Sequence, residues 1–396
     1  MPVPMNPNLV GALAPPVMEA RRWVADVAFP PDCPLLNFSQ AAPSLPPEKG
    51  LRQALAEAIL ELPEAHFYGP VLGDPDLREA IATRCSSLYG GKVEPFDVAV
   101  TSGCNQAFCA AVATLCAPGD AVAMAVPWYF NHKMWLDMAG VATIPFGCDA
   151  AMVPDIEACR AALTPETRAI LLISPNNPTG VEYDRATIRA FYGLARDTGR
   201  VLILDETYRD FHSQPGAPHG LFAEPDWRQH FIHLYSFSKV YRLTGHRVGA
   251  MVTGASRLAE AEKFLDTVTI CPSRVGQIGA LYGLMHLGEW VEAERREVLA
   301  RRAVLEDEIA SHLAGWRVAS AGAYFAWVVP PFDMPGATLA RRLVQERSLL
   351  FLPGSMFAPT GHAADWGCER AIRIAFANVG MDGLVEMTRR LATFAA

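Results

Sequence analysis

The feature that most constrains the fold of this chain is a series of short, mainly apolar runs, each ending in a polar cluster. The runs lie at residues 97–101, 121–126, 169–173, 201–204 and 231–235. Helical patterns separate them along the chain. A strand that is apolar along its whole length is typical of a parallel sheet covered by helices on both faces. The sequence therefore predicts an α/β fold with a mainly parallel sheet.

The polar clusters that follow these runs are the first indication of a ligand site. Ser102-Gly103-Cys104-Asn105 opens a predicted helix, Asn176-Asn177-Pro178-Thr179-Gly180 forms a turn, and Asp205 and Tyr208 follow a third run. In open α/β sheets ligands bind beyond the carboxyl ends of the strands, where these clusters fall. The free N–H groups of the first cluster favour an anion such as phosphate, although an ordinary serine cap explains it about as well.

A lysine and an arginine lie on a predicted loop between two apolar segments. Lys239 follows Ser236 and Ser238, and Arg247 comes eight residues later. Burying an unpaired cation is costly, so each needs a local reason to be there. Burial lowers the pKa of a lysine and exposes a neutral amine that can capture a carbonyl. A surface loop with a structural arginine is the alternative.

Asp205 follows four aliphatic residues and is expected in a dry crevice, where a carboxylate needs a cationic partner. That partner is a structural arginine or the protonated ring nitrogen of a cofactor. Tyr208 can present its hydroxyl to the same ligand, and Tyr129 either packs in the core or lies on a flat ring. One ligand meets all these needs: pyridoxal 5'-phosphate (PLP), which takes a lysine Schiff base and an acidic partner for its pyridine nitrogen.

The chain resembles the class I/II aminotransferases of the aspartate aminotransferase superfamily, the fold type I group of PLP enzymes. The resemblance runs from about residue 35 to the C-terminus. It rests on motifs in a fixed order: Tyr68 with Gly73, Gly103, Asn177-Pro178-Thr179-Gly180, Asp205 with Tyr208, Ser236-x-Ser238-Lys239, Arg247 and Arg373. It implies a large domain with a seven-stranded, mainly parallel sheet between helices, and a smaller α+β domain.

The resemblance implies that Lys239 forms the internal aldimine with PLP and then moves the proton between substrate and cofactor. Asp205 keeps the pyridine nitrogen protonated, Asn177 and Tyr208 hydrogen-bond the phenolic oxygen, and Tyr129 stacks on the ring. The implied phosphate contacts are Gly103, Cys104, Asn105, Ser236, Ser238 and Arg247. The implied reaction is a ping-pong exchange of an amino group between an L-amino acid and a 2-oxo acid.

Substrate contacts and a partner subunit are implied in the same way. Arg373 binds the substrate carboxylate as a two-pronged clamp, a geometry that a lysine cannot match, and Asn177 is a further substrate contact. Ala41 stands where relatives often carry a glycine against this carboxylate. Tyr68 reaches the phosphate of the neighbouring subunit, so a homodimer with shared active sites is implied.

The chain is expected to divide into three parts. Residues 1–47 are rich in proline and form an arm that joins the small domain, because chain ends are often close together. Residues 48–285 form the large PLP-binding domain, and residues 286–396 form the small domain.

Composition excludes several classes of function. The net charge is −8, so the sequence has no electrostatic footprint for nucleic acid. Its apolar runs are far too short to span a membrane, and its first residues lack the pattern of a signal peptide. The nine cysteines form no CxxC pair and the histidines no HxxxH or HxH pair. These patterns predict reduced thiols, a cytoplasmic protein and no metal site.

Other functions stay open on the residues alone. A C–S β-lyase, an amino-acid cyclase or a decarboxylase shares the lysine, aspartate and arginine set on the same scaffold. A regulatory PLP-binding module is disfavoured, because the motifs begin by residue 68 and the chain is acidic. The sequence does not identify the substrates, although Arg242 and Arg274 are candidates for a second carboxylate contact.

Overall fold

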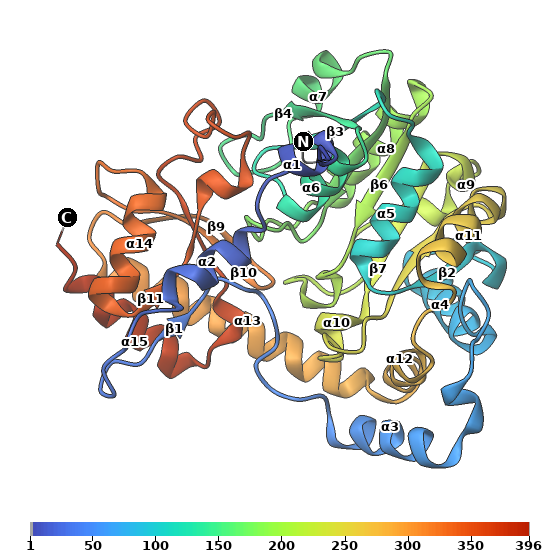
Figure 1. Cartoon of the computed structure of the whole chain (residues 1–396), viewed down its shortest axis with the longest axis horizontal. Helices are drawn as coiled ribbons and strands as arrows, with labels where there is room; N and C mark the ends of the chain where they lie inside the picture. The colour runs from blue at the N-terminus through green and yellow to red at the C-terminus, as the bar shows by residue number, and fades with distance from the viewer. Residues whose placement is uncertain (1–2, 396) are drawn as a thin grey trace.

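The structure, a computed structural model, describes residues 3–395 (Figure 1). The first two residues of the predicted arm and the last of the predicted small domain lie outside that range. A seven-stranded sheet has the order β2-β8-β7-β6-β5-β3-β4, and every pairing is parallel except those of β8 with β2 and β7. The prediction of an α/β fold with a seven-stranded, mainly parallel sheet is confirmed. Its strands are β2 (Val98–Thr101), β3 (Ala121–Ala125), β4 (Ala142–Phe146), β5 (Thr167–Ile173), β6 (Val201–Asp205), β7 (Phe231–Ser236) and β8 (Gly249–Val252).

Helices cover both faces of this sheet, which explains its uninterrupted apolar strands. Alternate residues of a strand point to opposite faces. Leu202 and Leu204 of β6 therefore join a core with α3, α4, α8 and α12, whereas Val201 and Ile203 join one with α5 and α11. The helices of this part are α3 (Lys49–Glu61), α4 (Pro75–Tyr89), α5 (Cys104–Leu115), α6 (Phe130–Met138), α7 (Ile156–Ala162), α8 (Arg185–Asp197), α9 (Trp227–His230), α10 (Phe237–Val240), α11 (Ala255–Thr269) and α12 (Arg274–His286).

The edge strand β4 has no apolar run in the sequence. Its residues are mostly half-buried or exposed, and it contains Pro145. Proline is tolerated at a sheet edge because no further strand needs its N–H. The apolar-run pattern that predicts its fully buried neighbours therefore does not predict β4.

A smaller antiparallel sheet, of order β12-β13-β10-β9, lies at the other end of the molecule (Figure 1, orange to red). Its strands are β9 (Arg317–Gly322), β10 (Phe325–Val329), β12 (Leu352–Pro353) and β13 (Ile372–Ile374). The helices of this end are α13 (Gly288–His312), α14 (Gly336–Arg347) and α15 (Met381–Ala392). The chain thus has the predicted smaller α+β unit, while the predicted domain boundaries stay predictions.

The N-terminal arm runs back along this smaller unit. β1 (Leu36–Asn37) pairs in parallel with β11 (Leu349–Leu350), and α2 (Pro16–Val24) contacts α14 and β12. α1 (Pro7–Gly11) instead contacts α6 of the large sheet. The blue arm in Figure 1 therefore lies beside both parts of the molecule.

Lys239 lies in a single helical turn, α10, and not on the loop that the sequence predicts. The turn follows β7 directly, and the Oγ of Ser236 caps it by accepting the N–H of Ser238. Serine is favoured at this position because its hydroxyl satisfies a free helical N–H. The correction matters for function, since a capped turn fixes the lysine side chain more firmly than a loop.

None of the helices within residues 3–395 is both long enough and apolar enough to cross a membrane. The nine cysteines, all within that range, form no disulfide.

Candidate active site

A cavity of about 460 Å³ lies where the carboxyl ends of β5, β6 and β7 face the arm and the small sheet. Except for Gly103 and Tyr68, the predicted site residues all line it. They are Ala41, Cys104, Asn105, Tyr129, Asn177, Asp205, Tyr208, Ser236, Ser238, Lys239, Arg247 and Arg373. The clusters that the sequence places at separate strand ends thus meet around one space.

Lys239 presents a buried amine to this cavity. Its Nζ donates to the carbonyl oxygen of Ala41 at 2.5 Å. Burial, together with the positive charges of Arg247 and Arg373, lowers the lysine pKa to about 8. A substantial fraction of the amine is therefore neutral near pH 8 and can act as a nucleophile or a base.

Asp205 has a partner that the sequence did not reveal. His132 of α6 places its Nε2 3.3 Å from Oδ2 of Asp205, and the backbone N–H of Thr207 donates to Oδ1 at 2.9 Å. Burial alone raises the pKa of the Asp205 carboxyl, but the contacts with His132 and Thr207 outweigh it and hold the pKa below its ordinary value. The carboxylate at the end of β6 is therefore charged and available to a cation in the cavity.

Arg373, on β13, is a buried guanidinium without a charged partner at its two hydrogen bonds. Its Nη1 donates to Oδ1 of Asn177 at 2.8 Å and its Nη2 to the carbonyl oxygen of Ser39, both neutral acceptors. The rings of Phe325 and Phe357 lie 4.9 Å from its central carbon. Its Nε has no hydrogen-bond partner among the described residues. Burial lowers its pKa to about 10, so it stays cationic and can receive an anion.

The anion end of the cavity is built by Gly103, Arg247 and α5. Gly103 has a φ of +89° and directly precedes α5. The free N–H groups at the start of this helix favour negative charge. A Cβ at this position would lie 2.3 Å from Nη2 of Arg247 and would displace the guanidinium, and the positive φ itself favours glycine. Nη1 of Arg247 donates to Oγ of Ser238 at 3.3 Å.

Cys104 does not behave as a reactive thiol. Burial and the nearby carboxylate of Asp205 raise its pKa well above the ordinary value. These effects outweigh the helix N-terminus, and the side chain is a small buried filler.

Two tyrosines complete the wall of the cavity. Tyr129 accepts a hydrogen bond from Nδ2 of Asn131 at 2.8 Å, and its ring lies edge-on to His132 at 5.1 Å. Tyr208 packs between Tyr324 and Phe325, with ring centroids 5.5 and 5.0 Å away. Burial raises the pKa of Tyr129 to about 12 and that of Tyr208 well above its ordinary value. Both hydroxyls therefore stay protonated and can donate to a ligand.

Two arginines and a tyrosine that the sequence singles out lie outside this cavity. Tyr68 is 80% exposed and does not line the cavity of its own chain. Arg242 pairs with Glu294 at 2.6 Å, and Arg274 pairs with Asp74. Neither arginine lines the cavity of its own chain.

Arg21 of α2 does line the cavity, and sequence reasoning missed it. Its hydrogen-bond acceptors are uncharged: Oε1 of Gln40 at 2.8 Å and Sδ of Met18 at 4.0 Å. The signal for it was weak, because an arginine on an N-terminal amphipathic helix is ordinarily a solvated surface residue.

Comparison with known proteins identifies the family. The model of the family "Aminotransferase class I and II" matches residues 34–391. The chain belongs to this family. The aminotransferase is 28% identical over 327 residues to an aromatic aminotransferase of Arabidopsis thaliana, with 80% of each chain covered. It is 28% identical over 403 residues to a probable aspartate/prephenate aminotransferase of Thermus aquaticus, covering 98% of this chain and 96% of that protein.

Solved structures share the fold of this aminotransferase. An aspartate aminotransferase of Thermus thermophilus, solved with maleate, superimposes with a TM-score of 0.89 at 22% identity, covering 98% of this chain and 99% of that one. The N-succinyldiaminopimelate aminotransferase of Mycobacterium tuberculosis gives a TM-score of 0.88 at 26% identity, covering 99% and 100%. The prediction of an aminotransferase is confirmed, and these relatives do not favour the lyase, cyclase or decarboxylase alternative. Aminotransferases of this class generally depend on PLP.

Proposed function

We propose that this aminotransferase binds PLP in the cavity and exchanges an amino group between an L-amino acid and a 2-oxo acid in two successive half-reactions. The observation that carries the proposal is the meeting of the Lys239 amine, the Asp205 carboxylate and the Arg373 guanidinium around one space. When bound, PLP supplies an aldehyde that condenses with amines and a ring that accepts the electron pair of the substrate carbon.

The residues fit this cofactor at both ends. Gly103, whose Cβ would collide with Arg247, forms a cradle for the phosphate at the start of α5, with Arg247 and Ser238 beside it. At the other end, the charged Asp205 can hold a protonated ring nitrogen, and Tyr208 and Asn177 can bind the phenolic oxygen. Cys104, Asn105, Ser236 and the ring of Tyr129 line the space between.

The chain's own residues perform the remaining work. Arg373 binds the substrate carboxylate through its two-pronged guanidinium, next to Asn177 and Ala41. The Nζ of Lys239, once released from the Ala41 carbonyl, would take the proton from the substrate α-carbon. The neutral acceptors around Arg373 and the phenylalanines that flank it exclude water and keep the guanidinium oriented.

Replacement of Lys239 tests the proposal. In purified wild-type enzyme, added PLP should give a visible absorbance band that an amino donor bleaches and a 2-oxo acid restores. Lys239→Ala should lose the band, and its turnover should fall by about 10²- to 10⁴-fold, since the proton carrier is gone. Lys263→Ala is the control, because Lys263 is an exposed lysine paired with Glu260. Wild-type turnover in Lys239→Ala, or no PLP band in the wild type, would refute the proposal.

Release of pyruvate and ammonia in place of bleaching would instead support a lyase. The bleaching readout therefore separates transamination from the alternative reaction on the same scaffold.

We further propose a homodimer in which Tyr68 completes the neighbouring active site. Its 80% exposure in the single chain supports an intermolecular role. Light scattering should give twice the chain mass. Mixed dimers of Tyr68→Ala and Lys239→Ala chains should regain activity that neither variant has alone, because one of their two sites is intact. Mixed dimers without activity would contradict a shared site.

The substrate side chain, we propose, extends toward α2. Arg21 lines the cavity, the acceptors of its hydrogen bonds (Gln40 and Met18) are uncharged, and it selects donors with a distal carboxylate. Val17, Met18 and Phe130 supply apolar surface beside it.

The unpaired state of the nine cysteines supports a reducing compartment such as the cytoplasm.

A further inference from the structure

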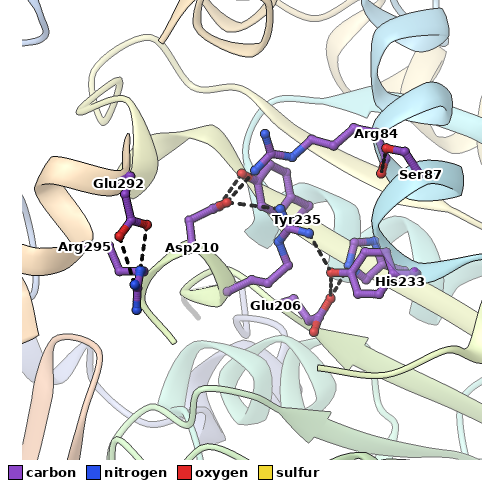
Figure 2. Close-up of polar contacts among 10 residues, drawn as sticks. Arg84, Ser87, Glu206, Asp210, His233, Tyr235, Glu292 and Arg295 are labelled. Atoms are coloured by element: carbon purple, nitrogen blue, oxygen red, sulfur yellow. Dashed lines mark hydrogen bonds and ion pairs between the residues drawn. The ribbon is translucent and has the colours of Figure 1, made fainter. Parts of the chain in front are cut away.

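Residues 205–210, at the end of β6 and just after it, are divided between the cavity and the protein interior. Asp205, Thr207 and Tyr208 line the cavity. Glu206 and Arg209 point away from it and are 0% and 7% exposed. Figure 2 shows Glu206 and Asp210 directed toward a group of polar side chains on α4 and β7. Each cavity-lining residue of this segment thus has a sequence neighbour whose side chain is buried on the side away from the cavity.

Glu206 gathers hydrogen bonds on one carboxylate oxygen. Its Oε2 lies 2.7 Å from Nε2 of His233 and 3.4 Å from Nε2 of His219, and it accepts the hydroxyl of Tyr89. Nη1 of Arg209 donates to the same tyrosine hydroxyl at 3.1 Å. Tyr89 therefore bridges a carboxylate and a guanidinium that are both buried.

Asp210 forms the second half of the network (Figure 2). Its Oδ1 accepts Nη2 of Arg84 at 2.5 Å and Nη2 of Arg209 at 3.0 Å, and its Oδ2 accepts the hydroxyl of Tyr235 at 2.5 Å. Tyr235 directly precedes Ser236 on β7. The network consequently ties the end of β6 to the end of β7, the strand that leads into Lys239.

The network is balanced in charge. It holds two carboxylates, Glu206 and Asp210, and two guanidiniums, Arg84 and Arg209. Despite burial, the neighbouring histidines hold the pKa of Glu206 low and the arginines hold that of Asp210 low. Burial lowers the pKa of His219, which stays neutral. Removing one partner would leave an uncompensated buried charge.

A metal ion is the other interpretation of this cluster, because the ligand atoms of Glu206, His219 and His233 lie within 4.8 Å of one another. The ring of His219 argues against it. Its Nδ1 accepts the backbone N–H of Leu221 at 3.1 Å, so the proton of the neutral ring is on Nε2, toward Glu206. That nitrogen has no lone pair for a metal, and the nearby Arg209 repels a cation. The cluster is a hydrogen-bonded network.

We propose that Glu206, Arg209 and Asp210 are positioning residues: their buried, charge-balanced network holds Asp205 and Tyr208 in place relative to Lys239. The inference rests on the proposed PLP site. None of these three residues lines the cavity, so the network would act on the site through the backbone of residues 205–210 and through the electric field of its charges. Loss of the negative charge of Glu206 and loss of the positive charge of Arg209 should therefore change the electrostatic potential at Lys239 in opposite directions.

The experiment uses the holoenzyme and follows the visible absorbance of bound PLP as a function of pH. Glu206→Gln removes a negative charge and should lower the midpoint of the absorbance titration by about 0.5–1 pH unit, the order of magnitude for loss of a buried unit charge at an effective dielectric of about 20. Arg209→Gln should raise the midpoint, and the double variant should return to the wild-type value. A purely structural role would not produce shifts of opposite sign that cancel.

Glu292→Gln is the matched control, because Glu292 forms an exposed pair with Arg295 on α13, which is also drawn in Figure 2 and is not linked to the network. Its midpoint should not move. Tyr89→Phe keeps all charges and removes only the bridging hydroxyl. It should raise the PLP dissociation constant by about fivefold, the effect of losing one hydrogen bond. This variant tests the proposal even if a charge variant does not fold.

Three results would overturn the inference. One is a Glu206→Gln midpoint equal to that of the wild type; another is Tyr89→Phe with unchanged PLP affinity. The third is one equivalent of a divalent metal such as zinc in the purified protein that is lost in His219→Gln, which would establish the metal interpretation. A wild-type protein that binds no PLP would instead refute the proposed function.

Discussion

His132 Nε2 lies 3.3 Å from Oδ2 of Asp205, so the carboxylate that ends β6 is held by an imidazole from α6. Both side chains are almost fully buried, and the ring of His132 packs on Phe108 with centroids 4.1 Å apart. The contact helps to keep the pKa of Asp205 below its ordinary value against the effect of burial. An imidazole thus supports the charge that a protonated ring nitrogen requires.

Loss of this contact should weaken catalysis without abolishing it. We expect His132→Phe to lower kcat/KM by about 10- to 100-fold, the effect of removing one hydrogen bond to a charged group. His132→Asn keeps a donor and should recover part of the loss. His362→Asn is the control, because His362 is exposed and pairs with Asp365. If steady-state kinetics showed the same loss of kcat/KM in His132→Phe and His132→Asn, a hydrogen-bonding role of His132 would be contradicted.

The lowered pKa of Lys239 should be visible in the pH dependence of stability of the cofactor-free protein. Its pKa falls from the ordinary 10.5 to about 8 on folding, mainly through burial. Below pH 8 the amine is protonated in both the folded and the unfolded protein. Burial of this charge then lowers the free energy of unfolding by its full amount, roughly 3 kcal/mol. Between pH 8 and 10.5 the unfolded chain holds more protons, so the free energy of unfolding rises with pH.

Lys239→Met lacks this titration and retains a side chain of similar length. We expect its advantage in free energy of unfolding over the wild type to be greatest near pH 7 and to vanish by about pH 10.5, as the ordinary lysine pKa is passed. Chemical denaturation at several pH values measures the difference. A gap that is constant with pH would exclude a lowered lysine pKa.

Arg373→Lys should separate charge from geometry. Lysine keeps the positive charge but cannot form two parallel hydrogen bonds with a carboxylate. We expect kcat/KM for every amino donor to fall by about 10- to 100-fold, mostly through KM. Arg370→Lys is the control, since Arg370 is a half-exposed arginine paired with Asp333. Unchanged KM values would remove Arg373 from the substrate site.

Arg21→Ala should change the choice of substrate and leave the chemistry intact. For donors with a distal carboxylate, such as aspartate or glutamate, we expect kcat/KM to fall about tenfold, because an exposed cation gains less from pairing than a buried one. Donors with aromatic or aliphatic side chains should keep or gain activity. Arg22→Ala, an exposed neighbour on α2 that does not line the cavity, is the control. An equal effect on both classes of donor would contradict the proposed role.

The central fold could be predicted because its signal is local. Strands buried on both faces, such as β5 and β6, are continuous apolar runs, and the turn chemistry of Asn177–Gly180 follows directly in the sequence. Half-buried strands such as β4 and β9 carry no such run. The turn of Lys239 was predicted as a loop, because a four-residue helix is too short to show periodicity.

The sequence by itself determined which segments form the buried sheet and which polar residues follow each strand, since spacing along the chain decides burial and turn type. Tertiary structure alone decided which charges meet. His132 reaches Asp205, Glu206 reaches His233, and Arg21 reaches the cavity, whereas Arg242 is neutralised by Glu294. These partners lie on different elements, and their proximity comes from packing across the sheet, which no local pattern records.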